Sequence, residues 1–103
     1  MFCIVFVTCP SIKEAEVIAL SVLKKKFAAC ANIISDVDSR FWWKGKLDRA
    51  KEALIMFKTT AGNFKKIEKE VRRLHSYEVP EIIAIPIAAG SGDYLKWIEK
   101  ETV

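Results

Sequence analysis

Residues 30–43 read Cys-Ala-Asn-Ile-Ile-Ser-Asp-Val-Asp-Ser-Arg-Phe-Trp-Trp, and a second apolar stretch follows from Glu52 to Thr59. Both are rich in β-branched and aromatic residues, as strands are, and Gly45 between them supplies a turn. At about 3.3 Å per residue, the first strand would extend over roughly 45 Å, well beyond the ~26 Å width of a compact 100-residue domain. The segment therefore predicts a hairpin whose far end projects from the domain.

The elements on either side of this hairpin complete one α+β pattern. In chain order we expect a strand from Met1 to Thr8, a helix opened by a Ser11/Glu14 capping box, the hairpin, a helix with Phe64, Ile67, Val71 and Leu74 on one face, a strand from Ile82 to Ala89, and a closing helix from Asp93 to Thr102. The order β-α-β-β-α-β plus a terminal helix predicts a ferredoxin-like fold in a single domain, residues 1–103. Pro86 is acceptable because the last strand of this topology lies at a sheet edge.

The strands are apolar on both faces, which predicts self-association. In the first strand Ile4 and Phe6 point one way while Val5 and Val7 point the other. Two crossover helices cover only one face of such a sheet, and a large exposed apolar face marks an interaction surface. We therefore expect a homo-oligomer. The alternative is a bent or bulged long strand that folds back over its own domain.

Composition excludes several classes of protein. The chain has 103 residues, 51% of them hydrophobic, but no apolar run of membrane-spanning length, and its apolar start is typical of a buried strand and not of a signal peptide. Three cysteines form no even framework, so reduced thiols in a cytoplasmic protein are expected. The net charge of +4 is spread over short basic clusters with acids between them. We accordingly expect no nucleic-acid and no membrane partner.

Several segments in order resemble the CutA family of divalent-cation tolerance proteins. They are Thr8-Cys9-Pro10, Ala29 to Ile33, Phe41-Trp42-Trp43-Lys44-Gly45-Lys46, Glu52 through Lys58-Thr59, His75-Ser76-Tyr77-Glu78-Val79-Pro80-Glu81-Ile82, and Asp93 to Ile98. The resemblance implies a homotrimer whose hairpins wrap neighbouring subunits, binding of divalent ions, copper especially, and an architecture similar to that of PII signalling proteins. The family usually has proline after the histidine; Ser76 stands there instead, which is expected to loosen the loop entrance.

Cys30 and His75 are the first candidate metal ligands, and Glu78 could add an oxygen. A thiolate and an imidazole suit copper or zinc. The two residues are far apart in the chain, so their convergence depends on the fold or on a neighbouring subunit. The alternative for Cys30 is a small buried hydrophobic residue.

A ligand cleft between subunits is a second expectation. Lys58 interrupts an apolar strand, and a buried lysine is costly unless it faces a carboxylate, such as that of Asp93 or Glu81, or an anionic ligand. If the long strand has no bulge, one face carries a polar row of Cys30, Asn32, Asp36, Asp38, Arg40 and Trp42. Aromatic residues that could wall the cleft, or simply pack, are Trp43, Tyr77 and Trp97.

The leading functional hypothesis is a non-enzymatic, metal-ion-responsive trimer. The alternative is a PII-like sensor of a small anionic metabolite. An RNA-binding module is disfavoured because the central strands lack exposed aromatic residues of the required kind. No nucleophile–base pair is recognisable, which argues against catalysis.

Overall fold

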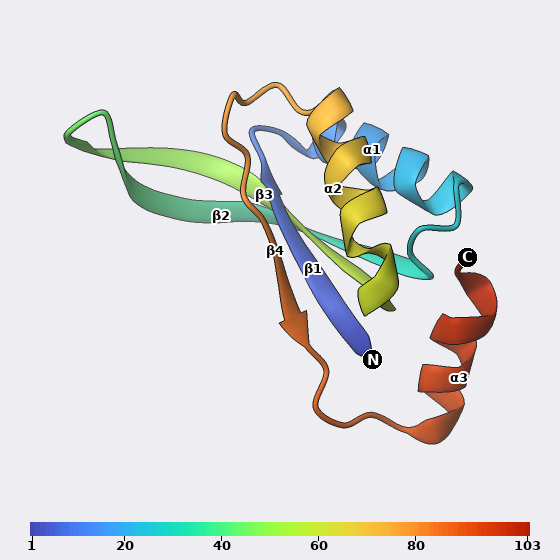
Figure 1. Ribbon diagram of the computed structural model, residues 1–103. Coiled ribbons are helices and arrows are strands. Elements are labelled where there is room, and N and C mark those ends of the chain that lie inside the picture. Colours follow the sequence, from blue (N-terminus) through green and yellow to red (C-terminus); the bar gives the residue numbers. More distant parts are fainter.

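One four-stranded antiparallel sheet and three α-helices make up the computed structural model, which describes residues 1–103 (Figure 1). The elements are β1 (Phe2–Cys9), α1 (Ile12–Lys24), β2 (Cys30–Trp43), β3 (Lys46–Thr60), a 3-10 turn η1 (Ala61–Asn63), α2 (Phe64–Leu74), β4 (Ile82–Pro86) and α3 (Gly92–Glu101). The strand order is β2-β3-β1-β4. The predicted ferredoxin-like α+β fold is confirmed.

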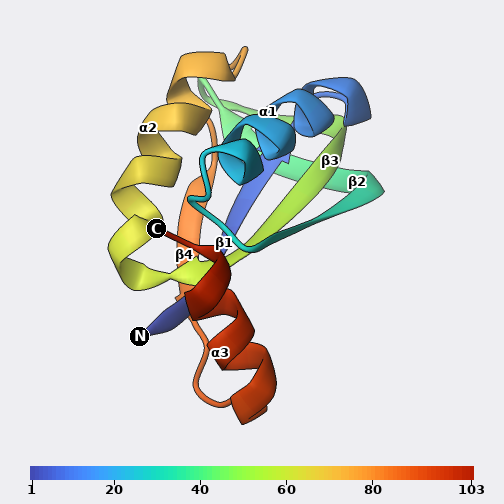
Figure 2. The same ribbon diagram turned by 90° about the vertical axis from the view of Figure 1, so that its right-hand side faces the viewer.

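The core lies between one face of the sheet and the pair α1 and α2 (Figure 2). Alternate residues of β1 and β3 point into it, and both helices contribute apolar residues at helical spacing. Its fully buried members include Val5, Val7, Ile18, Val22, Ile55, Phe57, Ile67 and Val71. The helix α3 lies apart from this pair, beyond the end of the sheet where β1 begins (Figure 1).

Neither α1 nor α2 covers the opposite face of the sheet. Ile34, Ile83 and Ile85 on this open face are 46%, 49% and 45% exposed, although each is a large aliphatic residue. Register places Ile83 beside Phe6 and Ile85 beside Ile4, so the apolar surface is continuous across the strands. One copy of the chain therefore leaves an apolar sheet face in water.

The hairpin projects from this body, as predicted. The molecule measures 44 × 25 × 22 Å, and the hairpin forms its long axis (Figure 1). Its two-residue turn has positive φ at both positions, Lys44 (50°) and Gly45 (78°), which matches the right-handed twist of the flanking strands. The returning strand, β3, begins at Lys46 and not at the predicted Glu52. Residues 46–51 are mostly polar and lack a clear alternation of apolar and polar side chains, but they still pair with β2 along the whole hairpin.

A β-bulge interrupts β2 and corrects the predicted polar row. Ile34 pairs with Leu54 but Val37 pairs with Glu52, so β2 carries one extra residue, and Asp36 adopts φ 59°. The bulge reverses the alternation. Cys30 and Asn32 lie on the open face, whereas Asp38, Arg40 and Trp42 lie on the other side of the hairpin.

The last strand is shorter than predicted. It ends at Pro86 instead of Ala89, because β1 begins at Phe2 and no partner strand remains beyond the hydrogen bond from the Ile87 N–H to Phe2 O at 3.0 Å. As expected, β4 lies at an edge of the sheet. No helix of the structure combines the length and apolar character needed to cross a membrane.

Candidate metal centre and adjoining groove

His75 lies where α2 ends, and its side chain is fully buried. Its backbone N–H donates to Val71 O at 2.8 Å, which closes the helix. The ring bridges two segments: Nε2 lies 2.7 Å from Thr8 O, and Nδ1 lies 3.0 Å from the Tyr77 backbone N. A carbonyl only accepts and an amide only donates, so these contacts define the neutral tautomer with its proton on Nε2 and its lone pair on Nδ1.

Three potential metal ligands meet at this point. Cys9 ends β1, Glu14 lies in the first turn of α1, and His75 caps α2; their ligand atoms all lie within 4.8 Å of one another. Glu14 Oε2 is 3.5 Å from His75 Nδ1. The arrangement brings together a thiol, an imidazole and a carboxylate from three separate elements.

Cys9 is fully buried, and this changes its acidity. Burial, together with the carboxylates of Glu14 and Glu52, raises the pKa of the Cys9 thiol to about 12. The thiol is therefore protonated at neutral pH. Any metal that binds Cys9 has to displace that proton.

Glu14 is held by the loop after α2 and not by its own helix. Ser11 Oγ accepts from the Glu14 amide at 3.2 Å, as the predicted capping box requires. The Glu14 carboxylate, however, accepts from the backbone N–H and the hydroxyl of Ser76. The other half of the predicted capping box, a bond from the Ser11 amide to the Glu14 carboxylate, is thus wrong, because this carboxylate bonds to Ser76 instead.

A groove of about 690 Å³ opens beside this cluster, under the projecting hairpin. It is lined by Thr8, Ser39, Arg40, Phe41, Trp43, Asp48, Glu52, Tyr77, Glu78, Val79, Pro80 and Glu81. Four of these residues are acidic and one is basic, although the whole chain carries +4. Of the predicted site residues, Trp43, Tyr77 and Glu78 therefore line one groove next to His75.

Tyr77 joins the groove to the cluster. Its hydroxyl donates to Glu52 Oε2 at 2.9 Å, and its ring lies 4.9 Å from the His75 ring, centroid to centroid. Glu52 is only 8% exposed. Burial and the neighbouring Glu52 carboxylate raise the pKa of Tyr77 to about 12, so its hydroxyl stays a donor at neutral pH.

The other predicted residues lie at the opposite end of the sheet. Asn32 Oδ1 accepts from Lys58 Nζ and from Cys30 Sγ, the latter at 3.7 Å. Trp97 lies on α3, its ring 5.5 Å from that of Tyr94. Lys58 thus has an amide oxygen as its partner instead of the predicted Asp93 or Glu81 carboxylate.

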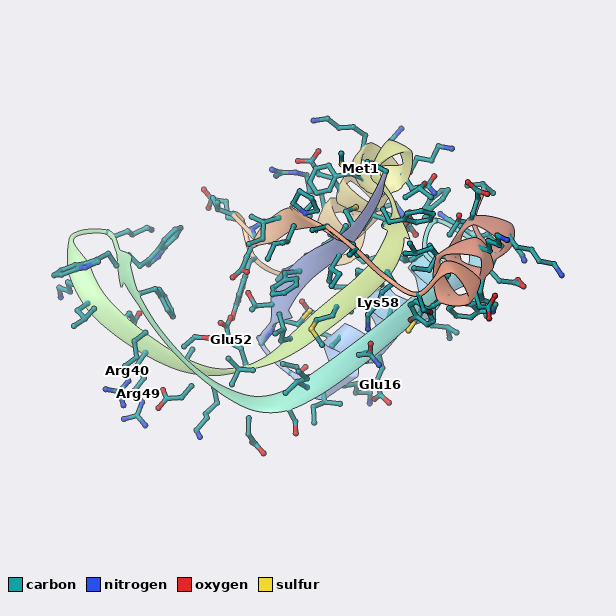
Figure 3. The ribbon with its side chains drawn as sticks, turned by 90° about the horizontal axis from the view of Figure 1, so that it is seen from below. Met1, Glu16, Arg40, Arg49, Glu52 and Lys58 are labelled. Carbon is teal, nitrogen blue, oxygen red and sulfur yellow. The ribbon has the colours of Figure 1, made fainter.

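One chain does not bring Cys30 to His75. Cys30 pairs with Lys58, which pairs with Ile4, whereas His75 contacts Thr8. Four residues along β1 correspond to about 13 Å, and Cys30 lies two strands further across. In Figure 3, Glu52 lies on the hairpin side of β3, and Lys58, the partner of Cys30 in the sheet, lies near its other end.

Three residues of the site were missed from the sequence: Cys9, Glu14 and Glu52. Cys9 follows the inward alternation of β1 but lies one residue beyond the predicted strand, and Glu14 was explained as a helix cap. Glu52 offered a usable signal, since a carboxylate at the start of a buried strand segment requires a partner.

Comparison with known proteins agrees with this architecture. Residues 3–101 match the family described as CutA1 divalent ion tolerance protein. The chain is 46% identical over 99 residues to the divalent-cation tolerance protein CutA of Archaeoglobus fulgidus, covering 96% of this chain and 95% of that protein. It is 42% identical over 97 residues to human protein CutA, covering 94% of this chain but only 54% of the human protein.

Solved structures give the same result. The divalent cation tolerance protein of Thermus thermophilus superposes with a TM-score of 0.98 at 39% identity, over 100% of both chains. A structure described as the periplasmic divalent cation tolerance protein CutA from Archaeoglobus fulgidus gives 0.95 at 42% identity, over 98% of both chains. This chain belongs to the CutA family of divalent-cation tolerance proteins.

Proposed function

We propose that the protein binds divalent metal ions, copper most tightly, as a homotrimer, and that Cys9, Glu14 and His75 hold the ion. The observation that carries this proposal is the convergence of their ligand atoms within 4.8 Å. It differs from the set expected from the sequence in having Cys9, and not Cys30, as the sulfur ligand.

The chemistry of the donor set fits such an ion. Thiolate and imidazole ligands suit copper and zinc, whereas magnesium and calcium prefer oxygen alone. Among divalent ions, nitrogen and sulfur sites generally bind copper most tightly. His75 Nδ1, which carries the lone pair, lies 3.5 Å from Oε2 of the Glu14 carboxylate.

The electrostatics of the groove also favour cations. Asp48, Glu52, Glu78 and Glu81 outnumber the single Arg40 along its walls. A concave surface with one sign of charge raises the local concentration of the opposite ion. Glu78 is in this groove, where it can supply a further oxygen ligand or guide the ion towards His75.

A trimer accounts for the apolar surfaces that one chain leaves exposed. The open sheet face bears Ile34, Ile83 and Ile85, and the hairpin bears Trp42 at 72% exposure. Exposed patches of this kind on a folded chain mark association surfaces. A neighbouring subunit would also offer the only route by which Cys30 could approach His75.

A second candidate function is the sensing of a small anionic metabolite between subunits, as in PII-like proteins. Lys58 favours it, because the residue is half-buried and its partner in the chain is the neutral Asn32 side chain. Trp97 would form one wall of the site around Lys58 and Asn32. The anion would then sit at a subunit boundary beside Lys58, at the opposite end of the sheet from the acidic groove.

We further propose that the protein acts by binding and not by catalysis, and that it works in the cytoplasm. All three cysteines are free, and two are buried. Free thiols are the ordinary state in a reducing compartment.

The metal proposal is tested on protein purified without chelator or affinity tag. Elemental analysis identifies the bound ion. Calorimetry then measures the affinity for copper, and for zinc as a redox-inactive check, in wild type, Cys9→Ser, His75→Ala and the matched control Cys30→Ser. We expect at least tenfold weaker binding for the first two variants only. If Cys30→Ser alone weakens binding, the ion lies at a subunit boundary; if no variant does, the proposal fails. Nucleotide and phosphate titrations with Lys58→Ala test the second candidate.

A further inference from the structure

We propose that Glu52, acting through Tyr77, is a positioning residue for His75. In this arrangement Glu52 and Tyr77 together oppose metal binding at His75 until the Tyr77 amide releases the imidazole ring. The inference rests on the proposed metal-binding function. It adds a residue, Glu52, whose hydrogen bond goes to Tyr77 and not to any of the three candidate ligands.

The contacts form one continuous path. Glu52 lies on β3 and lines the groove, 8% exposed, and its Oε2 accepts the Tyr77 hydroxyl at 2.9 Å. The Tyr77 backbone N–H then donates to His75 Nδ1 at 3.0 Å. Both ends of Tyr77, hydroxyl and amide, are therefore fixed, one in the groove and the other on the imidazole.

The path matters because His75 has one lone pair to offer. Its Nε2 proton is directed at Thr8 O, 2.7 Å away, so a metal can bind only at Nδ1 while this tautomer persists. That lone pair already accepts the Tyr77 amide. An ion at Nδ1 must displace the amide. Tyr77 is harder to displace because its hydroxyl donates to the buried carboxylate of Glu52.

Glu14 links this competition between the ion and the Tyr77 amide to the same loop. Its Oε2 lies 3.5 Å from Nδ1 but is itself bound by Ser76, the residue immediately before Tyr77. Displacing the Tyr77 amide therefore moves a loop that also holds a second candidate ligand. By reciprocity, an ion at the cluster should loosen Tyr77 and free Glu52 towards the groove.

Tyr77→Phe removes the hydroxyl and keeps the aromatic ring and the amide, so it tests the hydrogen bond to Glu52 alone. Two quantities are measured by comparison with wild type: hydrogen exchange of the residue-77 amide in metal-free protein, and the Kd for zinc. Tyr94→Phe is the matched control, because it removes the only other tyrosine hydroxyl, on α3. Glu52→Gln, which keeps the side chain's shape, is the second variant and should also make amide exchange at residue 77 faster. Its zinc affinity does not enter the test, because the variant removes one of the four acidic charges that line the groove.

We expect amide exchange at residue 77 to become about tenfold faster in Tyr77→Phe, and zinc to bind about three- to tenfold more tightly. Tyr94→Phe should change neither. Unchanged exchange, or zinc affinity that is unchanged or weaker when wild type binds zinc, overturns the inference. If wild type binds no zinc or copper, the proposed function fails, and the exchange rate alone decides whether Glu52 positions His75.

Discussion

Ser76 donates both its backbone amide and its hydroxyl to Oε2 of Glu14, at 3.1 and 3.0 Å. The resemblance to CutA proteins places proline at this position in most members. Proline has no N–H and no hydroxyl, so neither hydrogen bond would form. The serine was expected to loosen the loop entrance; instead it ties the loop to the first turn of α1.

The first prediction concerns this tie. Ser76→Ala removes the hydroxyl donor and should lower the free energy of unfolding by about 0.5–1.5 kcal/mol, the net worth of one hydrogen bond. Urea unfolding at one fixed protein concentration measures it, because association changes apparent stability. Ser35→Ala, at an exposed serine in the bulge, serves as the control. Equal losses for the two variants would contradict the role of Ser76.

The second prediction follows from the acidity of Cys9. Because its pKa is raised to about 12, the thiol is protonated throughout the neutral range, and an ion that binds it releases one proton. Zinc affinity should therefore rise about tenfold per pH unit between roughly pH 6.5 and 8.5. Calorimetry in buffers of different ionisation enthalpy counts the proton. A wild-type protein that releases none, or a Cys9→Ser variant that keeps the full slope, would argue against thiolate ligation.

The third prediction concerns acid stability. Hydrogen bonds from Arg73, Ser21 and Lys25 lower the pKa of Glu70 from 4.5 to about 2. The folded-state pKa is depressed, so the stabilisation is fully present above pH 4.5 and is lost as pH falls towards 2. The fall in pKa corresponds to at most about 3–4 kcal/mol, and because Lys25 and Arg73 are about half exposed we expect about 2 kcal/mol.

Glu70→Gln tests this directly. The variant should be less stable than wild type at pH 7 and should approach it near pH 2.5, in urea unfolding followed at several pH values. Glu68→Gln is a matched control on the same helix, where the glutamate pairs with Lys65 and Arg72 on the surface. A difference between Glu70→Gln and wild type that does not shrink in acid would rule out the carboxylate as its source.

Much of the fold could be predicted because local patterns and global packing agree. The alternation of β1, the helical spacing in α2 and the Lys44-Gly45 turn each specify one element, and the order of elements leaves few topologies. The bulge at Asp36 could not be predicted, because an extra residue in a polar strand segment leaves no break in hydrophobic alternation. It nevertheless decides which face carries Trp43.

The candidate site was predicted less completely, for a related reason. His75, Tyr77 and Glu78 are close together in the sequence, so they were found together. Cys9 joins His75 only because β1 ends beside the end of α2, a proximity that register and helix packing determine. Cys30, a better candidate by sequence, lies about 13 Å or more away along the sheet.

The fourth prediction tests the strain at the bulge. Asp36 has φ 59°, a left-handed conformation that glycine adopts freely and a β-branched residue resists. Asp36→Val should be about 1–2 kcal/mol less stable than Asp36→Gly in urea unfolding. Ser35→Val and Ser35→Gly provide the neighbouring comparison, since Ser35 is not among the residues with positive φ. A valine–glycine difference as small at position 36 as at position 35 would contradict the strain.

The last prediction concerns assembly. Trp43 lies at the tip of the projecting hairpin, 44% exposed, and faces the groove, so in a trimer it should be buried against a neighbouring subunit. Loss of a central aromatic anchor typically costs about 2 kcal/mol or more per interface. Trp43→Ala should therefore shift the trimer towards monomer in sedimentation experiments at micromolar concentration, before circular dichroism shows any change in the subunit. Val17→Ala, which trims a comparably exposed residue on the outer face of α1, should leave the trimer intact. A wild-type chain that sediments as a folded monomer would refute the trimer itself, and an unchanged dissociation profile for Trp43→Ala would remove this residue from the interface.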